Sequence, residues 1–500
     1  MRIKSVIFAT LMVVGFVPTT FAATQPNVLF VICDDLTTRI GPHGFAGIKT
    51  PVLDQFAKEG MTFTRNYCQY PVCGPSRASF LSGMYPESTG VLDNNSEIGD
   101  KHPGAINLPR AFRNAGYWTG GTGKVFHHSG ANPGNDSWDV VTSFENDEMP
   151  IERDARLAFE KEHGPITDKA NKAAWKKLLP TIAPQTRNQG LEGVGPGRGP
   201  SGLTDEAHAD GKNALQVAEW ITKKSHGDKP FFIGCGLHKP HIPTLAPQKY
   251  FDLYPLSSLD ISKDTMEGWN SIPKLAMVKG YAAYGFDAKI PNPDLARQYM
   301  QSYHACVSFI DAQLGVMINA LKASGQWENT IIIFIGDNGY HLGEHFHWGK
   351  VTLFEPSDNV PFLMRAPGVT IAGSRSEAKV ESLDCFPTLM ELCRITPPAQ
   401  LQGKSIVPIL KDPKAPGKDV VYTVVTRGKD PLILGTAIRF ENWRYTEWGS
   451  PTECELYDLT IDHAELNNLA PNTEYATIRA KAHALLEAKR VEALSKRTDK

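Results

Sequence analysis

Four short apolar runs, each followed at once by polar or glycine residues, constrain the fold of this 500-residue chain more than any other feature. Short apolar runs bounded by turn signals are typical of strands that are buried on both faces. Helical stretches lie between them, such as 50–58, where Thr50 suits an N-cap and Pro51 the first helical position. The alternation predicts an α/β fold with a mostly parallel sheet sandwiched by helices. The four runs are 28–33, 117–121, 231–237 and 331–335.

Composition narrows the class of protein further. The chain is 41% hydrophobic and 21% charged, which excludes a disordered protein, a collagen and a coiled coil. Its 52 Lys and Arg nearly cancel its 54 Asp and Glu, giving a net charge of −2. A nucleic-acid-binding face usually leaves a basic excess, so we expect no nucleic-acid partner.

The N-terminus predicts export. Residues 1–22 are predicted to form a signal peptide, with Arg2 and Lys4 before an apolar run at 6–17 and a small-residue cleavage site at 20–22. The alternative is a membrane anchor, but the run is shorter than a bilayer span. We therefore expect a periplasmic or secreted protein without stable membrane insertion.

The pattern of predicted elements changes after about residue 412, where short strands follow one another without long helices between them. We expect a large α/β domain over 23–412 and a smaller α+β subdomain over 413–500, with an antiparallel sheet and a closing helix. Two irregular regions, 139–228 and 251–295, are interpreted as insertions that act as lids or specificity loops. The strands expected in the subdomain are 420–425, 432–438, 443–447 and 455–458, before a helix over 473–494.

Eight cysteines are irregularly spaced. Cys33, Cys235 and Cys306 lie in apolar runs and are interpreted as buried free thiols. Cys385 and Cys393 could form a disulfide, although the residues between them look helical. The sequence leaves that pairing open.

Acidic and amide side chains follow two of the predicted strands. Asp34 and Asp35 end one strand, and Asp337 and Asn338 end another. Such oxygen donors are the ligands that Ca²⁺ and Mg²⁺ prefer. The plain alternative is a set of turn residues at strand ends. Because both pairs would face the same crevice at the carboxyl edge of the sheet, we favour a metal site.

The segment Cys73-Gly74-Pro75-Ser76-Arg77 is the most informative motif. Pro75 and Ser76 suit a helix start, which predicts Cys73 just before a helix N-terminus. That position lowers the pKa of a thiol and attracts anions. The residues alone indicate a reactive cysteine, with a buried structural cysteine as the alternative.

This pentapeptide resembles the signature of the type I sulfatases, whose cysteine a maturation enzyme oxidises to formylglycine. The similarity extends through 80–83 and, more loosely, from Pro26 to Asn468. Segments 123–127, 238–243 and 337–345 are most similar to the iduronate-2-sulfatases, which have His in place of Asn338. The resemblance implies an alkaline-phosphatase-like fold and makes 23–412 the catalytic domain.

The resemblance also implies a role for each matching residue. One Ca²⁺ would be held by Asp34, Asp35, Asp337, Asn338 and modified Cys73. Arg77 would orient the aldehyde hydrate that attacks sulfur, and Lys124 and Lys350 would bind sulfate oxygens. His127 would be the base that collapses the hydrate, and His238 the acid that protonates the leaving sugar oxygen. For the remaining nearby histidines, His128, His241, His345 and His347, we expect contacts to substrate or to neighbouring site residues.

The function implied is that of an exported sulfatase acting on a sulfated oligo- or polysaccharide, at the 2-O-sulfate of an unsaturated or iduronic uronic acid. The alternatives are a sulfatase for another, algal polysaccharide and a formylglycine-dependent phosphonate or phosphodiester hydrolase. A glycan-binding relative without activity and a thiol-based redox or hydrolytic protein are further alternatives. The sugar, exo or endo action and oligomeric state stay open.

Overall fold

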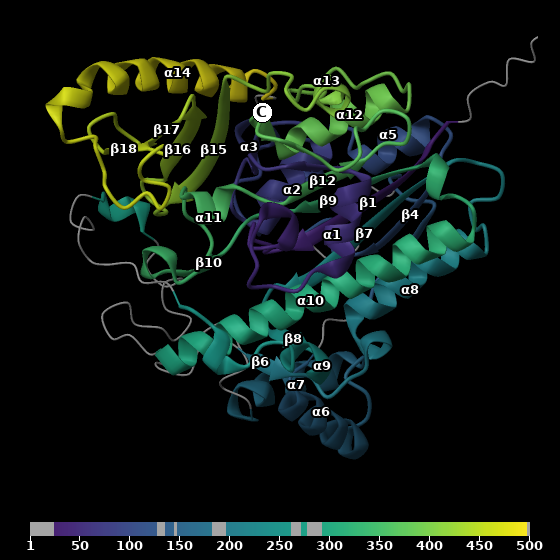
Figure 1. Ribbon diagram of the computed structural model, residues 1–500. Helices are drawn as coiled ribbons and strands as arrows, with labels where there is room; N and C mark the ends of the chain where they lie inside the picture. Colours follow the sequence, from purple (N-terminus) through teal and green to yellow (C-terminus); the bar gives the residue numbers. More distant parts are fainter. Residues whose placement is uncertain are drawn as a thin grey trace, which may run out of the picture.

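The computed structural model describes residues 25–127, 136–144, 148–182, 197–261, 272–277 and 293–497 (Figure 1). The predicted signal peptide at 1–22 and the candidate His128 lie outside these residues.

An eight-stranded sheet forms the centre of the molecule. Its strands are β1 (Asn27–Asp34), β2 (Met61–Phe63), β4 (Trp118–Gly123), β5 (Val140–Thr142), β7 (Phe231–Pro240), β9 (Thr330–Gly336), β12 (Phe362–Arg365) and β13 (Ser374–Ser376). They are ordered β13-β2-β12-β9-β1-β7-β4-β5. β12 runs antiparallel to both of its neighbours, whereas the other paired strands of this sheet are parallel. The prediction of a mostly parallel sheet is therefore confirmed.

Helices cover both faces of the sheet (Figure 1). One face carries α1 (Pro51–Glu59), α8 (Ala209–Thr222) and α10 (Pro293–Ala323), and the other carries α2 (Cys73–Ser82), α5 (Leu108–Asn114), α12 (Cys385–Leu392) and α13 (Val407–Lys411). Alternate residues of β1 feed the two cores: Leu29 and Val31 pack on the α10 side, and Phe30 and Ile32 on the other. The strand is apolar throughout because both of its faces are buried.

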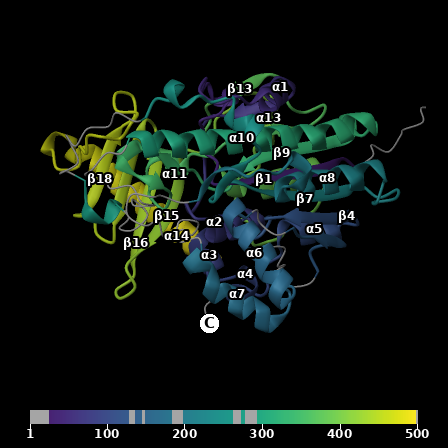
Figure 2. The ribbon, with the colours of Figure 1, turned by 90° about the horizontal axis from the view of Figure 1, so that it is seen from below.

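A second sheet of four antiparallel strands lies at one end of the molecule in both views (Figures 1 and 2). It is formed by β15 (Val420–Arg427), β16 (Ile433–Phe440), β17 (Trp443–Trp448) and β18 (Cys454–Asp458), and α14 (Ala476–Leu494) packs across it. The antiparallel sheet and the closing helix predicted for this region are confirmed. The domain boundary at 412/413 stays a prediction.

Buried ion pairs join this sheet to the main domain. Arg439 on β16 pairs with Glu355, the first residue of α11 (Glu355–Asp358), and its guanidinium lies 3.4 Å from Asp358. Arg444 on β17 pairs within the C-terminal region, 3.3 Å from Glu455 on β18 and 3.4 Å from Glu465. Glu465 in turn reaches the main domain, because its carboxylate accepts a hydrogen bond from the backbone N–H of Glu355 at 2.8 Å. Because these charges are buried, removing one partner would leave the other without compensation.

The prediction that 139–228 is a loop-like insertion is wrong in part. The region holds α6 (Pro150–His163) and α7 (Lys169–Ile182), and α8 belongs to the sheet-covering framework. Val217, Trp220 and Ile221 on α8 are buried in the core. The apolar residues of α8 are hard to recognise in the sequence because polar residues of its exposed face lie between them.

The long helix α10 was not expected either. By length and composition α10 could cross a membrane, yet it is largely buried and packs against α8 and β8 (Thr244–Ala246). It is a core helix of the main domain.

All eight cysteines are buried free thiols. This confirms the interpretation of Cys33, Cys235 and Cys306, and it excludes the pairing of Cys385 with Cys393 in this structure. α12 starts at Cys385 and ends one residue before Cys393, so the two residues lie at opposite ends of a helix.

Candidate active site

The acidic clusters of two neighbouring strands meet at the carboxyl edge of the central sheet. β1 and β9 are adjacent and parallel, with Cys33 in register with Gly336, so Asp34 and Asp35 lie beside Asp337 and Asn338. The backbone N–H of Asp35 donates to Asp337 Oδ1 at 3.0 Å, and Asn338 Nδ2 donates to Asp35 Oδ1 at 2.8 Å. Asp35 has a φ of 63°, which breaks the strand alternation at this turn. The structure thus brings together the four residues predicted as metal ligands.

Cys73 lies against these carboxylates. Its Sγ is 3.1 Å from Asp34 Oδ1 and 3.8 Å from Asp35 Oδ1. It is the first residue of α2, with Val72 as the N-cap, whereas the sequence predicted a helix start two residues later. The expected low thiol pKa is wrong, because burial and the charge of Asp34 raise the pKa of Cys73 far above its usual value. The unmodified thiol is therefore a poor nucleophile.

Three buried cations surround the cluster. Arg77, one turn along α2 from Cys73, places its Nε 2.8 Å from Asp337 Oδ2. Lys124, just after β4, pairs with Asp34. Lys350, just after β11 (Trp348–Gly349), pairs with Asp35 and lies 2.8 Å from Cys73 Sγ.

The two lysines remain charged although they are buried. Burial alone would lower the pKa of Lys350, but the charge of Asp35 outweighs it and raises that pKa well above its usual value. The pKa of Lys124 is raised in the same way, since Asp34 outweighs burial. Two ammonium groups held in place at the same cluster are suited to binding an anionic substrate.

Gly236 on β7 lies directly against the backbone of Lys124. A Cβ at Gly236 would lie 1.9 Å from the carbonyl carbon of Lys124. The backbone of Lys124 can therefore approach β7 only because this position has no side chain.

The residues fit a metal ion with oxygen ligands. One donor atom from each of Asp34, Asp35, Cys73 and His241 lies within 4.8 Å of the others. Asn338 Oδ1 is buried and has no hydrogen-bond partner in the described part of the chain. A carboxylate pair with a buried, unpartnered amide oxygen is suited to a hard divalent cation. The protein also orients the carboxylate of Asp337, since its oxygens accept hydrogen bonds from backbone N–H groups and from Arg77.

His241 belongs to this cluster, where the sequence analysis expected only a substrate or neighbour contact. Its Nε2 lies 3.9 Å from Asp35 Oδ2. Burial lowers the pKa of His241 to about 4, even though Asp34 and Asp35 act in the opposite direction. The ring is neutral at physiological pH.

His238 on β7 is held by a residue that the sequence analysis missed. Asp210, near the start of α8, accepts hydrogen bonds from the backbone N–H groups of His238 and Lys239 at 2.8 and 2.9 Å. Its Oδ1 also lies 3.4 Å from His238 Nδ1. No local pattern could have marked Asp210, because it falls in the region interpreted as an insertion and reaches His238 only through the fold.

The other candidate histidines have different surroundings. His127 is half-buried and follows Lys124 by three residues. His341, His345 and His347 are buried around the loop that carries Lys350, and His347 Nε2 lies 3.0 Å from the Lys350 carbonyl oxygen. His347 therefore supports this loop from within, as expected of a contact to a neighbouring site residue. The ring of His345 instead stacks on Phe354, with centroids 3.9 Å apart.

A buried set of cations and carboxylates at the carboxyl edge of such a sheet is suited to an enzyme that acts on anionic esters. The chain belongs to the sulfatase family: the sulfatase family model matches residues 26–395, and a model of the C-terminal region of N-sulphoglucosamine sulphohydrolase matches 343–492. It is a sulfuric ester hydrolase, and the resemblance found in the sequence is confirmed.

Individual relatives give the range of this similarity. A sulfatase of Formosa agariphila is 31% identical over 472 residues, which cover 92% of this chain and 86% of that protein. Human iduronate 2-sulfatase is 28% identical over 511 residues, covering 84% of each chain. The crystal structure of a phosphonate monoester hydrolase of Agrobacterium radiobacter has a TM-score of 0.74 at 23% identity, covering 94% of this chain and 96% of that one.

Proposed function

We propose that this sulfatase is exported and removes the 2-O-sulfate of an unsaturated or iduronic uronic acid from a sulfated glycan. We further propose that Cys73 is converted to formylglycine by a maturation enzyme and that one Ca²⁺ occupies the acid cluster. The observation that carries the proposal is the position of Cys73, buried between two carboxylates and within 2.8 Å of Lys350 Nζ. Similarity to human iduronate 2-sulfatase supports the choice of sugar.

The two cofactors would supply chemistry that the unmodified chain lacks. Formylglycine at position 73 would provide, when hydrated, one hydroxyl for attack at sulfur and a second for release of sulfate. Ca²⁺ held by Asp34, Asp35, Asp337, Asn338 and the modified residue 73 would offset negative charge on the sulfate oxygens.

The side chains of the protein would do the remaining work. Lys124 and Lys350 bind sulfate oxygens, and each fixed donor of this kind is worth ~2.7–4 kcal/mol in an oxyanion hole. Arg77, anchored on Asp337, orients residue 73. His127 takes a proton from residue 73.

His238 donates a proton to the leaving sugar oxygen. Because Asp210 faces Nδ1, the other ring nitrogen, Nε2, is the atom available to the substrate. A positioned acid of this kind contributes ~10²–10⁴-fold to the rate.

The raised pKa of Cys73 weighs against a thiol-based redox or hydrolytic function, because such proteins need an accessible thiolate. A phosphonate or phosphodiester hydrolase remains the alternative enzyme. The test below therefore also measures hydrolysis of a phosphonate monoester.

The test is sulfate release from defined sulfated disaccharides, by enzyme co-expressed with a formylglycine-generating enzyme. The formylglycine content is measured by peptide mass, and Cys73→Ala is the control. We expect release from 2-O-sulfated uronates that the control lacks. Release only from other sulfated sugars would contradict the proposed substrate, and faster hydrolysis of a phosphonate monoester would contradict the proposed reaction.

A further inference from the structure

A cavity of about 710 Å³ lies beside the chain that leads away from Asp35. It lies between the loop before α1, the segment 253–261 and one side of α10. Among its lining residues are Arg39, Phe45, Lys49, Tyr254, Ser258 and His304.

This cavity is close to the acid cluster along the fold. Tyr303 on α10 donates a hydrogen bond from its hydroxyl to the Asp35 carbonyl at 2.6 Å. The next residue, His304, lines the cavity, and Arg39, four residues after Asp35, forms part of its wall. Two consecutive residues of α10 therefore contact the backbone of Asp35 and line the cavity, respectively.

His304 gives the cavity unused hydrogen-bonding capacity. Its side chain is only 2% exposed, and neither ring nitrogen has a hydrogen-bond partner among the residues that the structure describes. The rings of Phe45 and Tyr254 meet it edge-on, with centroids 6.1 and 5.3 Å away. A neutral imidazole offers one donor and one acceptor, the pattern that a sugar hydroxyl complements.

Charged side chains lie at the rim of this cavity. Lys49 is exposed, and its ammonium makes no hydrogen bond or ion pair to any described residue. Arg39 is also cationic but pairs with Glu344, and Asp260 is a carboxylate in the lining. Lys49 is therefore the available site for an anionic group, while Leu259 and Met300 provide apolar surface for a ring.

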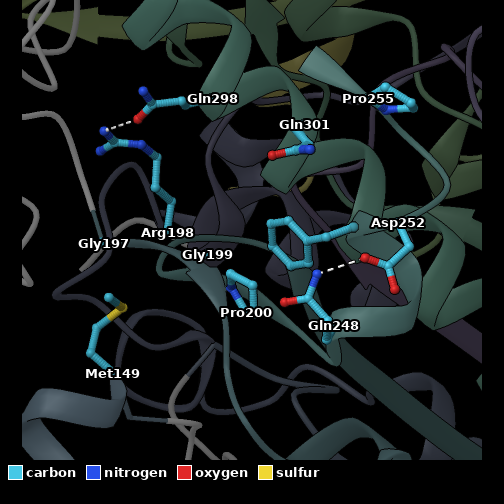
Figure 3. A pocket seen from close by; sticks show the side chains of 11 residues that line it. Met149, Gly197, Arg198, Gly199, Pro200, Gln248, Asp252, Pro255, Gln298 and Gln301 are labelled. Atoms are coloured by element: carbon cyan, nitrogen blue, oxygen red, sulfur yellow. Dashed lines mark hydrogen bonds between the residues drawn. The ribbon is translucent and has the colours of Figure 1, made fainter.

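A neighbouring cavity of about 650 Å³ lacks this unused capacity (Figure 3). There Arg198 donates to Gln298 at 3.0 Å, and Gln248 donates to Asp252 at 2.7 Å. These four side chains are engaged with one another, whereas the ring nitrogens of His304 and the ammonium of Lys49 have no hydrogen-bond partner among the residues that the structure describes.

We propose that the cavity lined by His304 and Lys49 is a second saccharide site, which binds an acidic sugar unit further along the glycan. The identity of the ligand as a glycan rests on the proposed function. Binding at this site does not require turnover, so the two proposals can fail separately.

The experiment measures binding of two probes, a 2-O-sulfated disaccharide and the corresponding tetrasaccharide from heparin, by calorimetry. Cys73→Ser protein is used so that no sulfate is released. Lys49→Ala removes the rim charge, and His304→Phe keeps a ring but removes both nitrogens. Lys58→Ala, an exposed lysine of α1 outside the cavity lining, is the matched control.

We expect the tetrasaccharide to bind about 10-fold more tightly than the disaccharide, and each cavity variant to lose about 5- to 10-fold of that gain, the size of one or two hydrogen bonds. Disaccharide affinity and the control should not change. Equal affinity for both probes, no binding of either, or tetrasaccharide binding unaltered in both variants would overturn the proposal.

Turnover of a small aryl sulfate by the mature enzyme separates the two proposals. If the enzyme hydrolyses the aryl sulfate but binds the disaccharide and the tetrasaccharide equally well, only the proposal of a second site is refuted. A protein that binds the tetrasaccharide through Lys49 but releases no sulfate from any probe keeps the site and loses the proposed reaction.

Discussion

Replacing Asp210 by Asn tests whether this buried carboxylate positions His238. Asp210 is fully buried and accepts two backbone N–H groups, at 2.8 and 2.9 Å, in addition to facing His238 Nδ1. Asparagine keeps one acceptor oxygen, so one of the N–H groups would face an amide NH₂. An unsatisfied buried donor costs about 1–3 kcal/mol, which is the expected loss in unfolding free energy.

The effect on catalysis should be larger than the loss of stability explains. Without the carboxylate, the imidazole of His238 loses the acceptor that fixes its orientation. Since a positioned general acid contributes ~10²–10⁴-fold, we expect kcat for sulfate release to fall about 10- to 100-fold with little change in KM. Steady-state kinetics well below the unfolding midpoint, normalised to formylglycine content, measure this.

Two comparisons make the result decisive. Asp205→Asn removes a carboxylate that accepts from Tyr250 at 2.6 Å nearby, and it should lower stability but leave kcat unchanged. In a His238→Ala background, Asp210→Asn should cost no further activity. Wild-type kcat in Asp210→Asn, or the same loss with and without His238, would refute the positioning role.

Three further predictions concern the metal, the cationic clamp and a buried histidine. Ca²⁺ at 100-fold excess over its Kd should stabilise the protein by about 2.7 kcal/mol, as seen in urea unfolding, and Asp35→Asn should lose this response; an unfolding midpoint indifferent to Ca²⁺ and chelator would contradict the metal site. Lys350→Ala should lower kcat/KM for sulfate release about 10²–10³-fold at equal formylglycine content, whereas Lys58→Ala should not; equal rates would exclude Lys350 from the site. Burial lowers the pKa of His304 to about 3 in the folded protein. As pH falls below 6.5, this imidazole is therefore protonated in the unfolded chain but not in the folded one, which lowers the free energy of unfolding. Wild type should therefore lose about 1.6 kcal/mol more unfolding free energy than His304→Phe between pH 6.5 and 5, and parallel pH profiles would contradict this.

Several features of this protein are determined by local sequence. The strands β1 and β9 are apolar runs that end in polar turns, so Asp34, Asp35, Asp337 and Asn338 could be placed at strand ends without coordinates. Because neighbouring parallel strands end at one edge, that placement also predicted their meeting. The motif around Cys73 was readable because its residues are consecutive.

Other features depend on contacts between distant segments. Whether Asp210 reaches His238 depends on how α8 packs on β7, and the direction of β12 depends on its pairing with β2 and β9. The pKa of Cys73 is raised rather than lowered because burial and the charge of Asp34 outweigh the charges of Lys124 and Lys350, and burial is not encoded in neighbouring residues.

The sequence by itself thus determined the chemistry-bearing residues and the class of fold, since strand periodicity and consecutive motifs are local properties of the chain. Only the tertiary structure decided which side chains are paired, such as Lys350 with Asp35, and which buried groups have no hydrogen-bond partner within the described part of the chain, such as the His304 ring. The physical reason is that hydrogen bonds and desolvation act between groups that lie far apart in the sequence and meet only when the chain is packed.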